Sequence, residues 1–402
     1  MMAFLQNVFL WVVPYLLVIT VIITIHELGH FLTARAFGVA VDRFSIGFGP
    51  SILSRRDKHG IEWRIGALPI GGYVKFAGDE NAASVPDEED LDVMRAKIIA
   101  REGPGAERKY LHFKPIWQRA LVVAAGPLAN FVLAIAIFSL TYAIAGHPVI
   151  STRIGAIMPN TPAAAAGFQV GDRLVSIDGR AINDFSSLKT YVATRAGVPV
   201  TIGVERAGKD VSLSTTPAQR SEKSLTGGEQ TIGYLGLEAE KGWIEHPNPL
   251  RATALGVQTT WDIAGSTLYY LGRIVTGQVN PNQLHSMLGM AHASGEVTKQ
   301  AVADARENHR NVLATSAAYL IPLVAFLSVS VGLLNLLPVP VLDGGHLLFY
   351  AYESIARRPA SARVQAAGYR VGLALLLGLM LFATWNDLQG LRVFHFLGGL
   401  IS

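Results

Sequence analysis

The sequence predicts a multi-pass α-helical membrane protein that crosses the bilayer four times and carries a small domain between its second and third crossings. Hydrophobic residues make up 50% of the 402 residues and charged residues only 16%. The mean hydropathy is +0.34, which is unusual for a soluble chain of this length. Uncharged runs occupy residues 1–25, 120–146, 311–342 and 371–386.

Each run is assigned to a transmembrane helix because of its length. Three of the four exceed the roughly 20 residues that a helix needs to cross the hydrocarbon core. The run at 371–386 is shorter, and it becomes a full span if the long side chain of Arg370 reaches the interface. We do not expect the run at 1–25 to be a cleaved signal peptide, because it lacks a basic start and an A-x-A-like site.

Lysine and arginine cluster in two connections, after the first helix and between the third and fourth, which we therefore expect on the cytoplasmic side. The N-terminus, the segment 147–310 and the C-terminus are then periplasmic. This basic collar accounts for the net charge of +4 and the isoelectric point near 9.2, so no nucleic-acid partner is expected. The chain has no cysteine, which excludes disulfides and thiolate ligands. The basic residues are Arg35, Arg43, Arg55, Arg56, Lys58, Arg64, Arg108, Lys109, Lys114, Arg119, Arg357, Arg358, Arg363 and Arg370.

The pentapeptide HELGH, residues 26–30, ends the first apolar run. His26 and His30 are four residues apart, so both imidazoles leave one face of a helix and can bind one metal ion at about 2.0–2.1 Å. Glu27 is adjacent and could take a proton from a metal-bound water. Polar side chains at the end of a membrane helix are costly and usually functional. The motif predicts a catalytic metal site, with a polar cluster at the membrane surface as the alternative.

A catalytic zinc site with two histidines needs a third protein ligand. Asp343 is the first candidate, because Pro338 and Pro340 interrupt the apolar run before it and would let a carboxylate point inward. His346 and Glu353 are rivals in the same neighbourhood. Weaker candidates, in loops with many ordinary charges, are Asp57, His59 and His112.

Between the first two helices the sequence alternates in the manner of strands. The stretches FSIGFG, IEWRIGAL and GYVKF have strand character, and Gly47, Gly49 and Gly72 would permit tight turns or the close approach of another backbone. We expect membrane-associated β-structure here. The stretch DENAASVPDEEDLD, residues 79–92, is expected to be a solvated acidic loop.

The periplasmic segment contains a second unit. IGAIMPNTPAAAAGFQVGDRLVSIDG reads as a strand, a short helix, a Gly-Asp turn and another strand, and VPVTIGVERAGKDVSLSTTP adds two alternating strands. This pattern resembles a PDZ domain of the bacterial protease-associated type over about residues 150–237, with an unspecified small β-domain as the alternative. A PDZ domain would bind an extended peptide or a C-terminus by strand addition. Residues 241–310 are amphipathic and helix-prone, without a chemical motif.

Six features occur in order: HELGH, GFGP, LPIGGYVKFAGD, FKPIWQRALVVAAGPLANF, the PDZ-like unit and NLLPVPVLDGG. Together they resemble the site-2 protease family of intramembrane zinc metalloproteases, peptidase family M50, in its bacterial sigma-E-pathway branch, over nearly the whole chain. The resemblance implies one zinc ion (Zn²⁺) per chain, held by His26, His30 and Asp343, with Glu27 as catalytic base. It also implies that Asn335 helps to hold the substrate near the metal.

The resemblance further implies that the GFGP and GGYVKF stretches receive the substrate as an added strand. It places the protein in a bacterial inner membrane with its active site toward the cytoplasm. The implied substrates are single-span membrane proteins of the anti-sigma-factor type that have already been cut outside, and leftover signal peptides are further candidates. The other expected partners are the lipid bilayer and a peptide at the PDZ domain. The implied substrate-strand residues are Gly47, Gly49, Gly72, Tyr73 and Val74.

The predicted function is regulated intramembrane proteolysis, in which the PDZ domain lies across the membrane from the metal and selects or excludes substrates. Two features depart from the branch: one PDZ domain instead of the frequent two, and HSMLGMAHASGE at residues 285–296 in place of a Gly-Pro-x-Gly-Ile stretch. The alternatives are a silent PDZ-presenting scaffold with a structural metal, and a metal transporter. An intact Glu27 argues against the scaffold, and the PDZ domain has no role in a transporter.

The expected organisation has seven parts. These are a first helix with HELGH (1–36), a cytoplasmic-side β-rich segment with the acidic loop (37–116), a second helix (117–146), a periplasmic PDZ domain (147–240), a periplasmic connector (241–310), a third transmembrane segment with the LDG motif (311–350), and a cytoplasmic connection with the fourth helix and the C-terminal tail (351–402).

Overall fold

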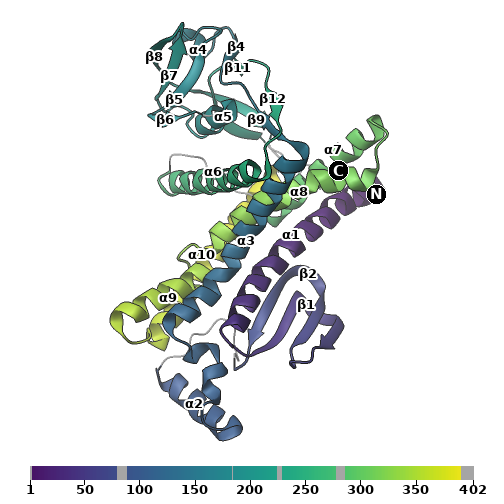
Figure 1. Cartoon of the computed structure of the whole chain (residues 1–402), viewed down its shortest axis with the longest axis vertical. Helices are drawn as coiled ribbons and strands as arrows, with labels where there is room; N and C mark the ends of the chain where they lie inside the picture. Colours follow the sequence, from purple (N-terminus) through teal and green to yellow (C-terminus); the bar gives the residue numbers. More distant parts are fainter. Residues whose placement is uncertain (1, 79–87, 183, 224–228, 278–285, 391–402) are drawn as a thin grey trace, which may run out of the picture. The chain divides into compact units, whose positions relative to one another are not determined.

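The computed structural model describes residues 2–78, 88–182, 184–223, 229–277 and 286–390. Contacts divide the chain into two compact units. The first unit contains the apolar helices and the sheet beside them, and the second contains a small α/β domain (Figure 1). The first comprises Met1–Phe138, Gly256–Gly265 and Ser286–Thr384, and the second comprises Ser139–Leu255, Ser266–His285 and Trp385–Ser402.

Four helices among the described residues are long and apolar enough to cross a membrane, which confirms the predicted number. The fourth begins at Ala362, well before the predicted run, and so contains Arg363 and Arg370. Both arginines are exposed, and their long stems can carry the guanidinium groups to the membrane interface. The four helices are α1 (Met2–Ala36), α3 (Ile116–Ala145), α8 (Val312–Asn335) and α10 (Ala362–Gly390).

The segment predicted to be helix-prone forms two helices, α6 (Pro249–Val275) and α7 (Met287–Glu307). Helix α7 packs against α1 and α8 (Figure 1). Small buried residues line α7, and a Cβ on Gly295 would collide with the Trp11 ring of α1. The small residues therefore allow the two helices to approach closely.

The segment after α1 forms the predicted strands, β1 (Val41–Arg56) and β2 (Glu62–Phe76), which lie beside α1 (Figure 1). Phe44 in the first half of β1 faces both Val74 and Trp63, which come from the two halves of β2. The first half of β1 therefore lies between the two halves of β2. The second half of β2 pairs on one side only and is an edge of this sheet.

Aromatic packing holds the sheet against α1. Phe31 of α1 lies 5.5 Å from Phe44 and 5.3 Å from Trp63, measured between ring centroids. The Thr20 hydroxyl of α1 donates to the Pro69 carbonyl of β2. Large apolar side chains elsewhere on the two strands are exposed, namely Phe48, Ile52, Leu53, Ile65, Leu68 and Ile70.

The end of the acidic stretch is helical. Residues 79–87 lie outside the described residues, but residues 88–92 begin the helix α2 (Glu88–Glu102), so the predicted loop is wrong for its last five positions. Two short 3₁₀ helices, Ala106–Lys109 and Leu111–Phe113, lead from α2 to α3. A buried cluster of Ile98, Ala106 and Tyr110 fixes this region.

The small α/β domain contains a four-stranded sheet of order β6-β5-β7-β8 and three two-stranded sheets. Its apolar core includes the buried side chains of Ile154, Phe168, Leu174, Leu188 and Ile202. The helices are α4 (Pro162–Ala165) and α5 (Phe185–Ala193). The strands are β3 (His147–Val149), β4 (Ile154–Ile157), β5 (Arg173–Ile177), β6 (Arg180–Ala181), β7 (Val200–Arg206), β8 (Lys209–Thr215), β9 (Ala218–Lys223), β10 (Glu229–Tyr234), β11 (Leu237–Ala239) and β12 (Trp243–Glu245).

One buried ion pair makes the stability of this domain depend on pH. The Asp172 side chain is 1% exposed, and its two oxygens accept hydrogen bonds from Arg206 at 2.8 and 2.7 Å. Hydrogen bonding to Arg206 lowers the pKa of Asp172 below its ordinary value. Because the pKa is lower in the folded protein, this stabilisation is fully present above about pH 4 and is lost as the pH falls through the folded-state pKa.

We expect Asp172→Asn to lower the free energy of unfolding of the α/β domain by about 2 kcal/mol at pH 7, as for other hydrogen bonds to charged groups. The loss should shrink at pH 3. Pulse proteolysis of the full-length protein in detergent micelles and urea measures both. Glu205→Gln, which removes the exposed partner of Arg173, is the matched control and should change stability by less than about 0.5 kcal/mol. Equal stability of Asp172→Asn and the wild type at pH 7 would contradict this account.

Candidate metal centre

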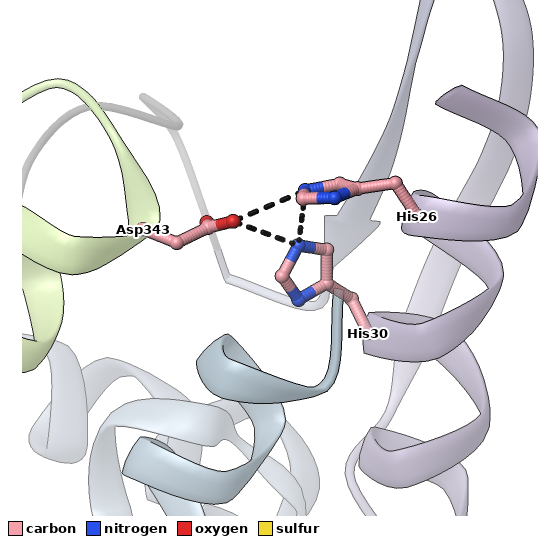
Figure 2. Close-up of side chains that lie close together, drawn as sticks. All are labelled: His26, His30 and Asp343. Carbon is pink, nitrogen blue, oxygen red and sulfur yellow. Dashed lines mark hydrogen bonds and ion pairs between the residues drawn. The ribbon is translucent and has the colours of Figure 1, made fainter. Parts of the chain in front are cut away.

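Helix α1 presents both histidines on one face, as the sequence spacing predicts. The Nε2 atoms of His26 and His30 are 3.2 Å apart (Figure 2). His26 is buried, and the His30 side chain is 12% exposed. Two imidazole nitrogens from consecutive helical turns therefore converge inside the protein.

Asp343 reaches the same point from another part of the chain. It is the first residue of helix α9 (Asp343–Ala356). Its Oδ2 atom lies 3.0 Å from His26 Nε2 and 3.6 Å from His30 Nε2 (Figure 2). One ligand atom from each of the three residues lies within 4.8 Å of the others. The structure thus brings together the three residues for which the sequence predicted metal binding.

The chemistry of these three groups fits a divalent metal ion. His30 Nδ1 lies 2.9 Å from the Val122 carbonyl, which can only accept, so Nδ1 carries the proton and Nε2 keeps its lone pair. Asp343 Oδ2 is buried and receives no hydrogen bond. A cation at the point where the three groups meet would bind both Nε2 atoms and the carboxylate oxygen. Two nitrogens and one carboxylate oxygen are a common catalytic zinc set.

Two glycines make room for this convergence. A Cβ on Gly29 of α1 would collide with the Ala125 carbonyl of α3, and a Cβ on Gly126 of α3 would lie 2.8 Å from His26 Nε2 and overlap His30 Nε2. Helices α1 and α3 can approach to this distance only because both positions lack a side chain.

The break between α8 and α9 lets the Asp343 carboxylate point inward, as predicted from the prolines before it. Helix α8 ends at Asn335, and α9 starts at Asp343 after an irregular segment. Gly344 and Gly345 lie so close to the carbonyls of Leu337 and Val339 that a Cβ at either glycine would collide with them. The segment therefore folds back tightly on the start of α9 and places the carboxylate inward.

The rival ligands have other partners. His346 Nε2 lies 3.4 Å from the Tyr369 hydroxyl, and Glu353 accepts a 2.5 Å hydrogen bond from Arg119 of α3. Asp57 accepts hydrogen bonds from the backbone of a tight turn and from Trp63. The metal-ion cluster found among the described residues contains none of the rivals, which also include His59 and His112.

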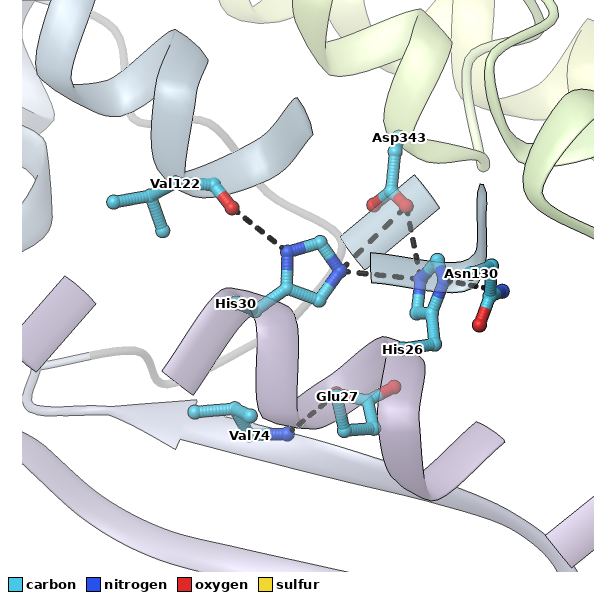
Figure 3. A network of polar contacts seen from close by, with 7 residues as sticks. All are labelled: His26, Glu27, His30, Val74, Val122, Asn130 and Asp343. Carbon is cyan, nitrogen blue, oxygen red and sulfur yellow. Dashed lines mark hydrogen bonds and ion pairs between the residues drawn. The ribbon is translucent and has the colours of Figure 1, made fainter. Parts of the chain in front are cut away.

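Glu27 follows His26 on α1 and points toward the β1–β2 sheet. Its Oε2 atom accepts a 3.0 Å hydrogen bond from the Val74 amide on the edge of β2 (Figure 3). A Cβ on Gly72 would lie 3.4 Å from Glu27 Cγ. The edge of the sheet therefore passes directly beside the predicted base.

The predicted substrate-binding residues lie in three places. Gly72 and Val74 contact Glu27, and Tyr73 lies between them in the chain. Gly47 and Gly49 have positive φ angles of 82° and 83° and pack against Leu68, so they shape a bend of the sheet. Asn335 is the last residue of α8, before the segment that leads to Asp343.

The sequence analysis assigned no role to three residues of α3 that surround the histidines. Val122 bonds to His30, Gly126 makes room for both rings, and the Asn130 amide lies 3.2 Å from His26 Nδ1 (Figure 3). The stretch AAGPLANF contains a glycine and an asparagine inside an apolar span, which was the available signal.

The chain is similar to known metalloproteases over nearly its whole length. The model of peptidase family M50 matches residues 14–379. Metalloprotease MmpA of Caulobacter vibrioides is 48% identical over 392 residues, covering 97% of this chain and 98% of the relative. A putative zinc metalloprotease of Agrobacterium fabrum is 41% identical over 385 residues, covering 95% and 96%. The regulator of sigma-E protease RseP of Salmonella typhimurium is 29% identical over 480 residues, covering 95% and 99%.

These matches extend over nearly the whole chain and include the four apolar helices and the residues that converge at the metal centre. They confirm the zinc metalloprotease resemblance predicted from the sequence, and the chain belongs to peptidase family M50.

Proposed function

We propose that this protein is an intramembrane metalloendopeptidase in which His26, His30 and Asp343 hold one zinc ion and leave a coordination position open. The observation that carries the proposal is the convergence of these three residues between apolar helices. A bound zinc ion supplies Lewis acidity, which makes water a stronger acid and a carbonyl carbon a better electrophile. An open position distinguishes a catalytic site from a closed structural one.

Glu27 is the proton carrier of the reaction. It accepts a proton from the attacking water and delivers it to the nitrogen of the leaving amine. Its position next to His26 in the chain keeps it near the metal, and its hydrogen bond to Val74 holds the carboxylate at the sheet edge. A structural metal site needs no adjacent base, so Glu27 favours an enzyme over a scaffold.

The substrate binds as an extended strand along residues 72–74 of β2. This part of β2 is an edge of the described sheet, so its outward backbone groups can pair with another chain. A membrane helix must unwind before a protease can attack it, and strand addition supplies hydrogen bonds to the unwound segment. Because Gly72 and Val74 adjoin Glu27, the added strand would pass beside the base.

The substrates are single-span membrane proteins. An active site among four apolar helices, next to a sheet with exposed apolar side chains, suits a peptide bond at membrane depth. The relative from Salmonella typhimurium is named for regulation of sigma-E. By analogy, anti-sigma factors that have been trimmed outside are the proposed targets.

The α/β domain serves as a PDZ domain that controls access. Its four-stranded sheet, two short helices and the pairing of β11 with β4 support this assignment. In the described part of the chain, β11 has a strand partner on one side only, which leaves an edge for a peptide. The distribution of basic residues supports a location of this domain outside the inner membrane, with the metal toward the cytoplasm.

We expect Glu27→Gln to abolish cleavage and to leave zinc bound, because an amide cannot accept the water's proton and Glu27 is not a ligand. His26→Ala should lose both. The assay incubates detergent-purified protein with a single-span substrate, with and without a chelator, and metal content is measured on the same sample. Cleavage by Glu27→Gln at a substantial fraction of the wild-type rate would refute the assigned base.

Asp343→Ala should lower the zinc content of the purified protein about as much as His30→Ala does. His346→Ala should keep a stoichiometry near one, because His346 lies beside Tyr369 and outside the cluster. The measurement is metal analysis after gel filtration in detergent. Full occupancy without Asp343 and loss without His346 would transfer the third-ligand role.

Deletion of the PDZ domain should leave zinc in place and preserve cleavage of substrates whose external part is already short. The truncated protein should also cut substrates with bulky external domains that the full-length protein refuses, since a gate has been removed. Zinc content is measured on the same preparation, because the deletion could disturb the flanking helices. If zinc-loaded truncated protein rejects short and bulky substrates alike, the domain is not a gate.

A further inference from the structure

Asn130 is a polar residue in a place where polarity is costly. It lies within the apolar helix α3, and its side chain is 0% exposed. An amide without a hydrogen-bond partner in such surroundings destabilises the fold. The Asn130 amide therefore needs a hydrogen-bond partner, and the side chain beside it belongs to His26, a predicted metal ligand.

The contact joins the amide group of Asn130 to the far side of the His26 ring. The Asn130 side-chain nitrogen lies 3.2 Å from His26 Nδ1 (Figure 3). The other end of the amide, Oδ1, is buried and has no hydrogen-bond partner. The opposite ring atom, Nε2, faces His30 and Asp343.

A histidine that binds a metal through Nε2 carries its proton on Nδ1. That proton needs an acceptor, and an outer acceptor of this kind orients the ring and strengthens its bond to the metal. The side chain of Asn130 can supply one, because a half-turn of the amide exchanges its nitrogen and oxygen without changing its shape. The unpaired Oδ1 then accepts from His26 Nδ1–H.

Helix α8 packs closely against α3 at Asn130. The Ser328 hydroxyl donates to the Asn130 carbonyl at 3.0 Å. A Cβ on Gly332 would lie 3.2 Å from the Asn130 Cβ, so the two helices are in close contact there. Helix α8 continues into the segment that ends at Asp343, so the same contact links the placement of the two ligands.

We propose that Asn130 is a positioning residue for the metal centre, whose carboxamide oxygen holds His26 in the tautomer that presents Nε2 to the ion. The proposal rests on the proposed function of His26 as a zinc ligand. It gives each histidine an outer partner on α3. His30 donates to the main-chain carbonyl of Val122, and His26, once the amide is turned, donates to Oδ1 of Asn130. Substitution can remove only the second partner.

The test measures zinc affinity and not proteolysis. Full-length protein in detergent is equilibrated with zinc and a competing chelator at pH 7, and bound zinc is determined after gel filtration. Asn130→Leu keeps the volume and removes the acceptor, so its zinc affinity should fall about 10–100-fold, as for other outer-partner losses. Asn130→Asp keeps an acceptor at the same place and should stay within about threefold of the wild type.

Ser328→Ala is the matched control, because it removes a hydrogen bond to the same residue without touching the amide. Its zinc affinity should stay within about threefold of the wild type, since the ring partner is unchanged. The pH at which half of the zinc dissociates should rise in Asn130→Leu and stay constant in the control.

Two outcomes would overturn the positioning role. One is unchanged zinc affinity in Asn130→Leu. The other is a fall in the zinc affinity of Asn130→Asp of more than about tenfold. That result would mean that an acceptor is not what His26 needs from Asn130, and that either the amide N–H group or the shape of the amide matters instead. If Asn130→Leu does not fold, the zinc affinity of Asn130→Asp alone decides whether Asn130 acts as an acceptor for His26. Wild-type protein that binds no zinc would instead refute the proposed ligand set.

Discussion

The metal centre depends on how closely α1 and α3 approach each other. Gly29 and Gly126 set this distance, since a methyl group at either position would collide with the facing helix or with the ligand rings. At this separation the His30 ring can bond to the Val122 carbonyl and the His26 ring can reach Asn130. Apolar helices in a bilayer gain little from hydrophobic burial against each other, so packing of small residues and polar contacts must determine their spacing.

The sequence predicted those features that depend on local pattern. Apolar runs identified the four spanning helices because the bilayer fixes their length. The HELGH spacing placed two imidazoles on one face, and the prolines before Asp343 indicated a break in the helix. The acidic stretch was mistaken in part for a loop, because residues 88–92 are highly charged yet start α2.

Contacts between distant segments could not be predicted. Nothing in a single sequence shows that Asn130 meets His26, or that Phe44 lies between Val74 and Trp63. Residue types made Asp343 the first candidate for the third ligand but left His346 and Glu353 as rivals. Glu353 is excluded only by its bond to Arg119, which lies 234 positions away in the chain. Such pairings follow from helix packing, and they separate residues that converge at the candidate metal centre from residues that merely have suitable chemistry.

Helix α3 is the common partner of the groups that hold the metal centre. Arg119 binds Glu353 and lies 4.9 Å from the centre of the Tyr350 ring, which fixes α9 behind Asp343. Asn130 and Ser328 join α3 to α8. Where water is scarce, few water molecules compete for hydrogen bonds and ion pairs of this kind. These contacts can therefore hold the helices in one arrangement.

Helix α1 separates this support from the substrate. His26 and His30 face α3, whereas Glu27, about 100° further around the helix, faces the edge of β2 (Figure 3). A chain that adds to β2 thus approaches the base from one side while the ligands are held from the other. In the proposed function, a substrate strand would therefore pair with and leave β2 on the side of α1 that does not contact Val122 and Asn130.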